Sequence, residues 1–355
     1  MALILVLPAA ACSVPVFRYA LEHWKADAYQ AIVFHRGALT AAHARLARSL
    51  GKDGLAGELH ANLSVQTVDL DGDVTPGLLS LSREATALPW LVVRAPLANR
   101  VPATVHSGPL DADTLKPLLE SPARREITRR LADGQSAVWL LLESGDRDKD
   151  AAAAGLIESR LAFLGSNLHL PKLEAQDIAN GLVSLPADGL RLEFSLLRLS
   201  RTDPAERVFV QSLLGTEHDL AAVREPVVFP VFGRGRALYA LVGAGIRRET
   251  VDQAAQFLIG KCSCQVKDQN PGADLLFAAN WDRLIKSQTN ALPDLPSLAE
   301  LAKSAPVTVT ISADTILTGN EATAAHSQPA PTTWLVVGAL VTLAFAFAAF
   351  FRGRT

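Results

Sequence analysis

The same order of predicted strands and helices occurs twice along the chain, and this repetition limits the folds that the chain can adopt. The first occurrence begins with a short β-rich run and continues with a helix that Gly51 ends. Each occurrence has the order β-α-β followed by β-β-α. The first contains predicted strands at 29–37, 61–72, 88–93 and 102–106 and predicted helices at 38–51 and 107–121.

The second occurrence begins with a nearly continuous apolar run, which is expected of a strand that helices cover on both faces. Pro204 lies in the first turn of one helix, and Gly233-Arg234-Gly235 forms a tight turn between two strands. We predict strands at 136–145 and 190–200, a strand pair within 225–243, and helices at 151–165, 204–215 and 247–260.

Length and composition exclude several classes of protein. The chain has 355 residues, of which 49% are hydrophobic and 20% charged, so it can form a packed core and is not disordered. At roughly 100–200 residues per domain, two domains are expected. The net charge of -2 argues against a nucleic-acid-binding protein, and three cysteines are too few for a disulfide scaffold.

This order of elements resembles the thioredoxin fold, present twice. In that family a proline, commonly cis, precedes the third core strand, and Pro89 and Pro226 stand at the matching positions. The resemblance covers 28–119 and 136–260, and strand order and one proline per copy carry it. It implies an α/β fold class with two tandem thioredoxin-like domains.

The family's redox motif, Cys-x-x-Cys at the start of the first helix, is absent from both copies. The corresponding residues are His35-Arg36-Gly37-Ala38 and Ser144-Gly145-Asp146-Arg147. Neither copy is therefore expected to carry out ordinary dithiol exchange at that place. The strings at 228–246 and 257–276 also resemble an uncharacterised group of bacterial envelope proteins, a likeness that brings no known activity with it.

The C-terminal run 334–351 contains no charged residue and is followed by Arg352 and Arg354. A helix of this length just crosses the hydrocarbon core, which is about 30 Å thick at about 1.5 Å rise per residue. Trp334 stands where an interfacial aromatic residue is expected, and the two arginines are the positive-inside signal. We therefore predict a membrane span with a cytoplasmic tail, preceded by a flexible tether at 319–333.

The N-terminal run has features of an export signal, with an apolar stretch followed by an A-x-A cleavage site. It is short and has no positive start, so three alternatives stay open: a start codon annotated too late, a buried apolar strand, or an uncleaved second apolar segment at the membrane. Cleavage after Ala11 would leave Cys12 first, which resembles a bacterial lipoprotein box. Cys12 is then a lipid-bearing residue, a disulfide partner of Cys262 or Cys264, or part of an uncleaved signal.

Cys262-Ser263-Cys264 is the sequence feature with the most reactive side chains. It follows the last predicted helix of the second copy between Lys261 and Lys267, where nearby positive charge lowers a thiol pKa. Three interpretations stay open: a structural disulfide or buried thiol pair, a redox-active pair, and two ligands for Cu(I) or Zn. Two ligands do not complete a metal site, and no further Cys or His pair stands nearby.

Other candidate groups have simpler explanations. His35 stands where the first copy would begin its active-site turn, and His43 follows on the next helix, but this pair lacks a third metal ligand. Asp69, Asp71 and Asp73 imitate part of a calcium loop, although Val74 and Ser80 replace the glycine and glutamate that it requires. Arg234 and Arg236 in the glycine turn are candidates for contact with an anionic partner. The sequence contains no Gly-x-Ser-x-Gly, His-Glu-x-x-His or Walker pattern.

These features together predict a single-pass protein of the bacterial inner membrane with periplasmic domains. We expect a binding or assembly module for a protein partner in the envelope, with no resident cofactor and no nucleic acid; the sequence favours a non-enzymatic role and leaves enzymatic activity open. The alternative is a thiol-disulfide oxidoreductase, or a Cu- or Zn-handling protein, that uses Cys262 and Cys264. The expected segments are a signal peptide at 1–11, degenerate thioredoxin-like domains at 12–130 and 131–318, a linker at 319–333, a transmembrane helix at 334–351 and a cytoplasmic tail at 352–355.

Overall fold

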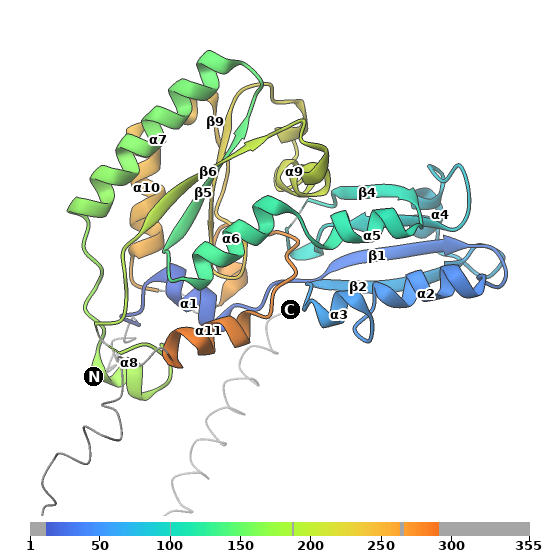
Figure 1. Ribbon diagram of the computed structural model, residues 1–355, viewed down its shortest axis with the longest axis horizontal. Helices are drawn as coiled ribbons and strands as arrows, with labels where there is room; N and C mark the ends of the chain where they lie inside the picture. The colour runs from blue at the N-terminus through green and yellow to red at the C-terminus, as the bar shows by residue number, and fades with distance from the viewer. Residues whose placement is uncertain (1–11, 100, 187, 263–265, 291–355) are drawn as a thin grey trace, which may run out of the picture. The chain divides into compact units, whose positions relative to one another are not determined.

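The protein has a mixed α/β architecture with two β-sheets (Figure 1). The computed structural model describes residues 12–99, 101–186, 188–262 and 266–290. All of these residues belong to the unit Met1–Pro293. The α/β class expected from the sequence is therefore confirmed for the part of the chain that the structure describes.

The first sheet has the strand order β2-β1-β3-β4. β1 is parallel to β2 and antiparallel to β3, and β3 is antiparallel to β4. The register pairs Tyr29 with Leu63 and Phe34 with Trp90. The four strands predicted for the first copy are confirmed, with the bounds β1 (Tyr29–His35), β2 (Leu63–Asp69), β3 (Trp90–Arg94) and β4 (Thr104–Pro109).

Helices cover both faces of β1, which explains its almost uninterrupted apolar sequence. Residues of α2 and α5 pack on one face, and residues of α4 pack on the other. Thr40 caps α2 by accepting a hydrogen bond from the His43 N–H, and Asp111 caps α5 in the same way from Thr114. The helices are α2 (Ala41–Ser49), α3 (Leu55–Glu58), α4 (Pro76–Ser82) and α5 (Ala112–Leu119).

The second sheet has the strand order β10-β8-β7-β5-β6, with β9 paired to β7. β5 is parallel to β6 and antiparallel to β7, and β7 is antiparallel to β8, so these four strands repeat the order and directions of the first sheet. The predicted strands are again confirmed. The bounds are β5 (Ala137–Glu143), β6 (Phe194–Ser200), β7 (Val227–Phe232), β8 (Arg236–Ala237), β9 (Leu241–Val242) and β10 (Ala273–Asp274).

β5 is buried at every position except its last, because two helix layers enclose it. Side chains of α7 and α10 pack with Trp139 and Leu141 on one face, and side chains of α6 and α9 pack with Val138 and Leu140 on the other. These helices are α6 (Pro122–Ala132), α7 (Arg147–Asn167), α9 (Arg207–Leu214) and α10 (Arg248–Ile259).

Several elements were not predicted. α1 (Val16–His23) belongs to the core of the second sheet, where the strand-like bridge between Pro15 and Lys261 joins it to the segment after α10. The sequence analysis also missed α8 (Ala175–Ala179) and α11 (Trp281–Asn290), as well as α3, α4, α6 and β10. Short 3-10 helices occur at Leu97–Asn99, Pro204–Glu206, Leu220–Ala222, Gly243–Gly245 and Lys267–Gln269.

Backbone groups of β10 and of the segment after it join the two sheets by hydrogen bonds to Asn62 and Asn99. Asn62, before β2, exchanges hydrogen bonds with Phe277: the Asn62 N–H donates to the Phe277 carbonyl at 3.1 Å, and Asn62 Oδ1 accepts from the Phe277 N–H at 2.8 Å. Asn99 forms the same kind of double contact with the backbone of Asp274, at 2.9 and 3.0 Å. The two halves therefore share buried polar contacts.

The predicted signal peptide, tether and transmembrane helix lie outside the described residues. Among the helices that the structure describes, none is both long and apolar enough to cross a bilayer.

Candidate functional site

The turn after β1 occupies the place that the sequence analysis assigned to a degenerate active site. We call residues 35–38 the β1 turn. Phe34 pairs with Trp90 in the antiparallel β1–β3 ladder, so His35 and Pro89 follow at the same end of the sheet. The Leu88–Pro89 peptide bond is cis, as expected for a proline at this position. The β1 turn and the proline therefore lie side by side.

Carboxylates after β2 close the β1 turn. Asp69 Oδ1 accepts hydrogen bonds from the N–H groups of Gly37 and Asp71, each at 3.1 Å. These bonds hold the pKa of Asp69 below its usual value, and the bond from the Asp71 N–H contributes most. Arg36 forms an exposed ion pair with Asp71 at 2.6 Å. The aspartates that imitate a calcium loop in the sequence therefore support this turn.

The two histidines singled out from the sequence make separate local contacts. His35 Nδ1 lies 2.8 Å from the carbonyl oxygen of Gly37, and His43 Nδ1 lies 3.1 Å from the Thr40 hydroxyl. No group of three or more His, Cys, Asp or Glu side chains among the described residues is arranged to hold a metal ion.

The turn after β5, residues 144–147, is closed more completely, and we call it the β5 turn. The buried carboxylate of Asp150 accepts hydrogen bonds from Ser144 N–H and Oγ, both at 2.8 Å, and from Gly145 N–H at 3.0 Å. Asp146 caps α7 by accepting from the N–H groups of Asp148 and Lys149. The backbone donors at this helix start are thus occupied by the chain's own carboxylates.

Apolar side chains are exposed on the segment that leads to Pro89. Leu79 in α4 is 43% exposed and Leu88 is 39% exposed, whereas most leucines of the two sheets are buried. Trp90 is buried beneath this segment, and its indole N–H donates to the Ser107 hydroxyl at 2.9 Å. Leu88 stands directly before Pro89, so one exposed apolar side chain lies next to the polar β1 turn.

Two of the three cysteines lie among the described residues, and both are buried. Cys12 is 4% exposed and Cys262 is 2% exposed, and the Cys262 N–H donates to the carbonyl of Val14 at 2.9 Å. Burial raises the pKa of the Cys12 thiol, and the charges of Asp177 and Glu174 add to this shift. Cys12 is a free thiol, which this environment keeps protonated. Cys264 lies outside the described residues.

A buried ionic cluster that the sequence analysis missed lies between the two halves. The carboxylate of Asp274 accepts from Arg236 Nη1 at 2.8 Å and from Lys267 Nζ at 2.9 Å, and Lys267 also pairs with Asp27 at 2.6 Å. Burial would raise the pKa of Asp274, but the charges of Arg236 and Lys267 outweigh burial and hold that pKa below its usual value. The only signal in the sequence was an arginine and an aspartate inside apolar runs.

Two members of the ionic cluster, Asp27 and Arg236, line a cavity of about 460 Å³ together with Asn99, Glu217, Tyr239 and Asp268. Arg236 Nε and Nη2 donate to the carbonyl oxygens of Pro271 and Asn270, so its guanidinium is fully used within the protein. This cavity therefore offers no uncompensated positive charge to an anionic ligand.

The arginines of the 233–236 turn are directed inward, which corrects the suggestion that they contact an anionic partner. Arg234 Nε donates to the Leu21 carbonyl at 2.8 Å and Nη2 donates to the Glu22 carbonyl at 3.0 Å. Arg234 also pairs with Asp282 at 2.8 Å. Together with Arg236, it fastens α1 and the segment after β10 to the hairpin.

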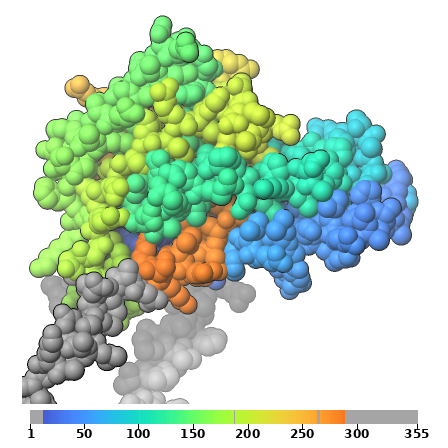
Figure 2. All heavy atoms as spheres, in the orientation of Figure 1, coloured from blue at the N-terminus to red at the C-terminus, as the bar shows by residue number. Residues whose placement is uncertain are grey.

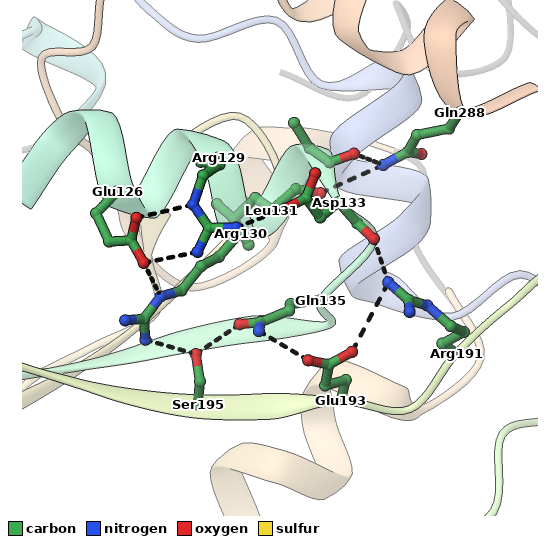
Figure 3. Close-up of polar contacts among 11 residues, drawn as sticks. Glu126, Arg129, Arg130, Leu131, Asp133, Gln135, Arg191, Glu193, Ser195 and Gln288 are labelled. Atoms are coloured by element: carbon green, nitrogen blue, oxygen red, sulfur yellow. Dashed lines mark hydrogen bonds and ion pairs between the residues drawn. The ribbon is translucent and has the colours of Figure 1, made fainter. Parts of the chain in front are cut away.

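The arginines of α6 are paired in the same way (Figure 3). Glu126 accepts hydrogen bonds from both Arg129 and Arg130. These bonds lower the pKa of Glu126 to about 2, and the bond from Arg129 contributes most. Arg130 reaches Ser195 in β6 at 3.0 Å, and Ser195 donates to Gln135 at 2.5 Å. This surface of α6 and β6 is a chain of mutually satisfied contacts.

Neither a known family model nor any curated protein matches this sequence.

Proposed function

We propose that the protein is a binding or assembly module built on two thioredoxin-like halves, with its partner site at the β1 turn and the Leu88–Pro89 segment. It is anchored in the bacterial inner membrane by 334–351, and its two halves lie in the periplasm. Its partner is another protein of the envelope. In this proposal the protein has a thioredoxin-like fold and lacks the dithiol chemistry of a thioredoxin.

The observation that carries the proposal is the chemistry of the two turns. Each follows the first strand of its sheet, where a thioredoxin-like enzyme would place its thiols, and each has a carboxylate that accepts from backbone N–H groups of the turn: Asp69 in the first half and Asp150 in the second. A thiolate gains reactivity from free N–H donors at a helix start; here Asp146 occupies those of α7, and the Thr40 hydroxyl occupies one of α2.

The strand arrangement supports the thioredoxin-like description. Both sheets have one parallel pair, β1–β2 or β5–β6, followed by two antiparallel pairings in the same order. The cis Leu88–Pro89 bond stands directly before the third strand of the first half. The bond before Pro226 is not among the cis bonds of the described residues.

The burial of two cysteines supports binding over thiol exchange. Cys262 is almost completely buried, and the pKa of Cys12 is raised by its surroundings. A redox-active thiol needs an accessible sulfur with a lowered pKa.

Site-specific photo-crosslinking in the producing organism tests the proposed site. A photoreactive residue is placed at Leu88, at Leu79 and, as a control of similar exposure on α7, at Phe163, which is 48% exposed. We expect one protein adduct from Leu88 and Leu79 that is absent from Phe163. Equal labelling at all three positions, or an adduct at Phe163 alone, would place the binding surface elsewhere and contradict the proposal.

A further inference from the structure

The segment from 28 to 52 is basic, within a chain whose net charge is slightly negative. It contains Arg36, Arg45, Arg48 and Lys52 and not a single aspartate or glutamate, although the whole chain has a net charge of -2. Arg36 is neutralised by Asp71. The other three cations are exposed. Three exposed cations therefore lie on α2 and in the turn that follows it, with no carboxylate between them.

We call Arg45, Arg48 and Lys52 the α2 stripe. With 3.6 residues per turn, Arg45 and Arg48 project from the same side of α2, and Lys52 follows in the turn after the helix. None of the three side chains forms an ion pair or a side-chain hydrogen bond with any other described residue. The nearest carboxylates along the chain, Asp53 and Glu58, are exposed and form no ion pair with the stripe.

Some arginines on other helices are paired with carboxylates of described residues, whereas others, such as Arg248, are not. Arg129 and Arg130 on α6 share Glu126, and Arg160 on α7 holds Asp252 with two hydrogen bonds of 2.5 Å. Favourable contact with the carbonyl end of α2 accounts for a cation at Arg48 or Lys52. It does not account for Arg45, which lies in the middle of the helix.

The apolar face of α2 is already used by the core. Ala47 and Leu50 are buried against the first sheet, and Leu46 packs beside them. Helices that lie on a lipid surface need apolar side chains to insert between the lipids, and α2 has none left for that purpose. The slightly acidic chain as a whole does not suit nucleic acid. A linear array of exposed cations instead matches carboxylates that are spaced along a peptide.

We propose that the α2 stripe is a docking surface for an acidic segment of a partner protein. The inference rests on the proposed binding function and adds the chemistry of the partner. It does not depend on the site at Leu88, because the stripe is a separate set of residues. Carboxylates spaced three to four residues apart on the partner would each meet one of the three cations. Such contacts act mainly through long-range attraction, so binding should weaken as salt is added.

The test measures binding of a fluorescent helical peptide that carries three glutamates at positions i, i+3 and i+7 to the full-length protein in detergent. The glutamine version of the peptide is the first control. The variant R45Q/R48Q/K52Q removes the stripe. The variant K116Q/K172Q/R248Q removes three exposed cations from other parts of the chain that form no ion pair with described residues, and so changes the net charge equally.

We expect about tenfold weaker binding for the stripe variant at low salt, since three exposed charge pairs are lost. The matched control should change the affinity by less than about twofold. Equal loss in both variants, or equal affinity for the glutamine peptide, would overturn the proposal. Circular dichroism confirms that each variant is folded.

A charge-reversed variant and a vesicle-binding experiment test the α2 stripe further. If the stripe variant does not fold, the charge-reversed pair R45E/R48E should reject the glutamate peptide and bind a lysine version instead, and failure to bind the lysine version would contradict the proposal. Stripe-dependent binding to vesicles that contain phosphatidylglycerol, without binding to the peptide, would assign the surface to lipid. If photo-crosslinking from Leu88 gives no adduct while the glutamate peptide still binds, the proposed partner site at Leu88 is wrong but the α2 stripe is not.

Discussion

Replacing Asp274 with asparagine should destabilise the protein strongly, because this carboxylate is the centre of the buried ionic cluster. It accepts from Arg236 at 2.8 Å, from Lys267 at 2.9 Å and from the backbone N–H of Asp27 at 2.7 Å, and its side chain is only 4% exposed. Removing one partner of a buried ion pair leaves an uncompensated charge, which costs about 3–5 kcal/mol.

The other contacts of the ionic cluster place the expected loss in free energy of unfolding at the lower end of this range. Lys267 keeps its ion pair with Asp27 and its bond to the Lys25 carbonyl, so Arg236 alone is left without a carboxylate. We therefore expect the free energy of unfolding to fall by about 3 kcal/mol at neutral pH. The change is measured by urea unfolding followed by circular dichroism.

The matched control is Asp71→Asn, which breaks the exposed ion pair with Arg36. Because exposed pairs contribute little, this substitution should cost less than about 1 kcal/mol. A cost below about 1 kcal/mol for Asp274→Asn as well would refute the reasoning that the buried cluster holds the halves together.

The pH dependence gives a second check on the same residue. The folded-state pKa of Asp274 lies below its usual value, so its charge contributes stability above the unfolded pKa of about 4, and this contribution is lost as the pH falls through the lower folded pKa. The difference in stability between wild type and Asp274→Asn should therefore be largest at neutral pH and shrink in acid. A constant difference from neutral pH down to acid would contradict the assignment.

Three further predictions follow from the same contacts. Asp150→Ala should lower the free energy of unfolding by about 3 kcal/mol, because three donors of the β5 turn lose their acceptor. Asp148 is exposed, so Asp148→Ala should lower it by less than about 1 kcal/mol. Similar values for both variants would show that the turn does not depend on Asp150. In a Cys262→Ser/Cys264→Ser background, Cys12 should react with a thiol reagent about a hundredfold more slowly in the native chain than in denaturant, and equal rates would contradict its burial. Deletion of 334–355 should move the protein from the membrane fraction to the soluble fraction, and retention in the membrane would refute anchoring by this segment.

Local patterns were sufficient to predict most of the two sheets. The continuous apolar sequence of β5 reflects helices on both of its faces, and Gly51 marks the end of the helical pattern that forms α2. These signals are contained within a few neighbouring residues. The strand order within each sheet could be proposed because the same succession of elements occurs twice.

Contacts between distant residues could not be predicted in the same way. α1 was missed because its packing partners, including α10, lie more than two hundred residues later in the chain. The ionic cluster joins Asp27 to Lys267 and Asp274, and no local pattern distinguishes these charges from solvent-exposed ones. α6 carries many arginines, and only the structure shows that Glu126 and Ser195 use two of them.

The positions of the β1 turn and Pro89 were predicted from the sequence, but the contacts that surround them were not. The sequence placed a degenerate turn at 35–38 and a proline at Pro89, and both lie at the same end of the first sheet. The exposure of Leu88 and the roles of Asp69 and Asp150 as acceptors depend on backbone geometry at the turns, which the residue types alone do not determine.

The central claim, a thioredoxin-like binding module without dithiol chemistry, is tested most directly by the rate at which the full-length protein reduces a fluorescent disulfide peptide in the presence of dithiothreitol. We predict that the rate equals that of dithiothreitol alone and is the same for the Cys262→Ser/Cys264→Ser variant. Catalysed turnover that this variant loses would contradict the claim and assign the protein to thiol-disulfide exchange.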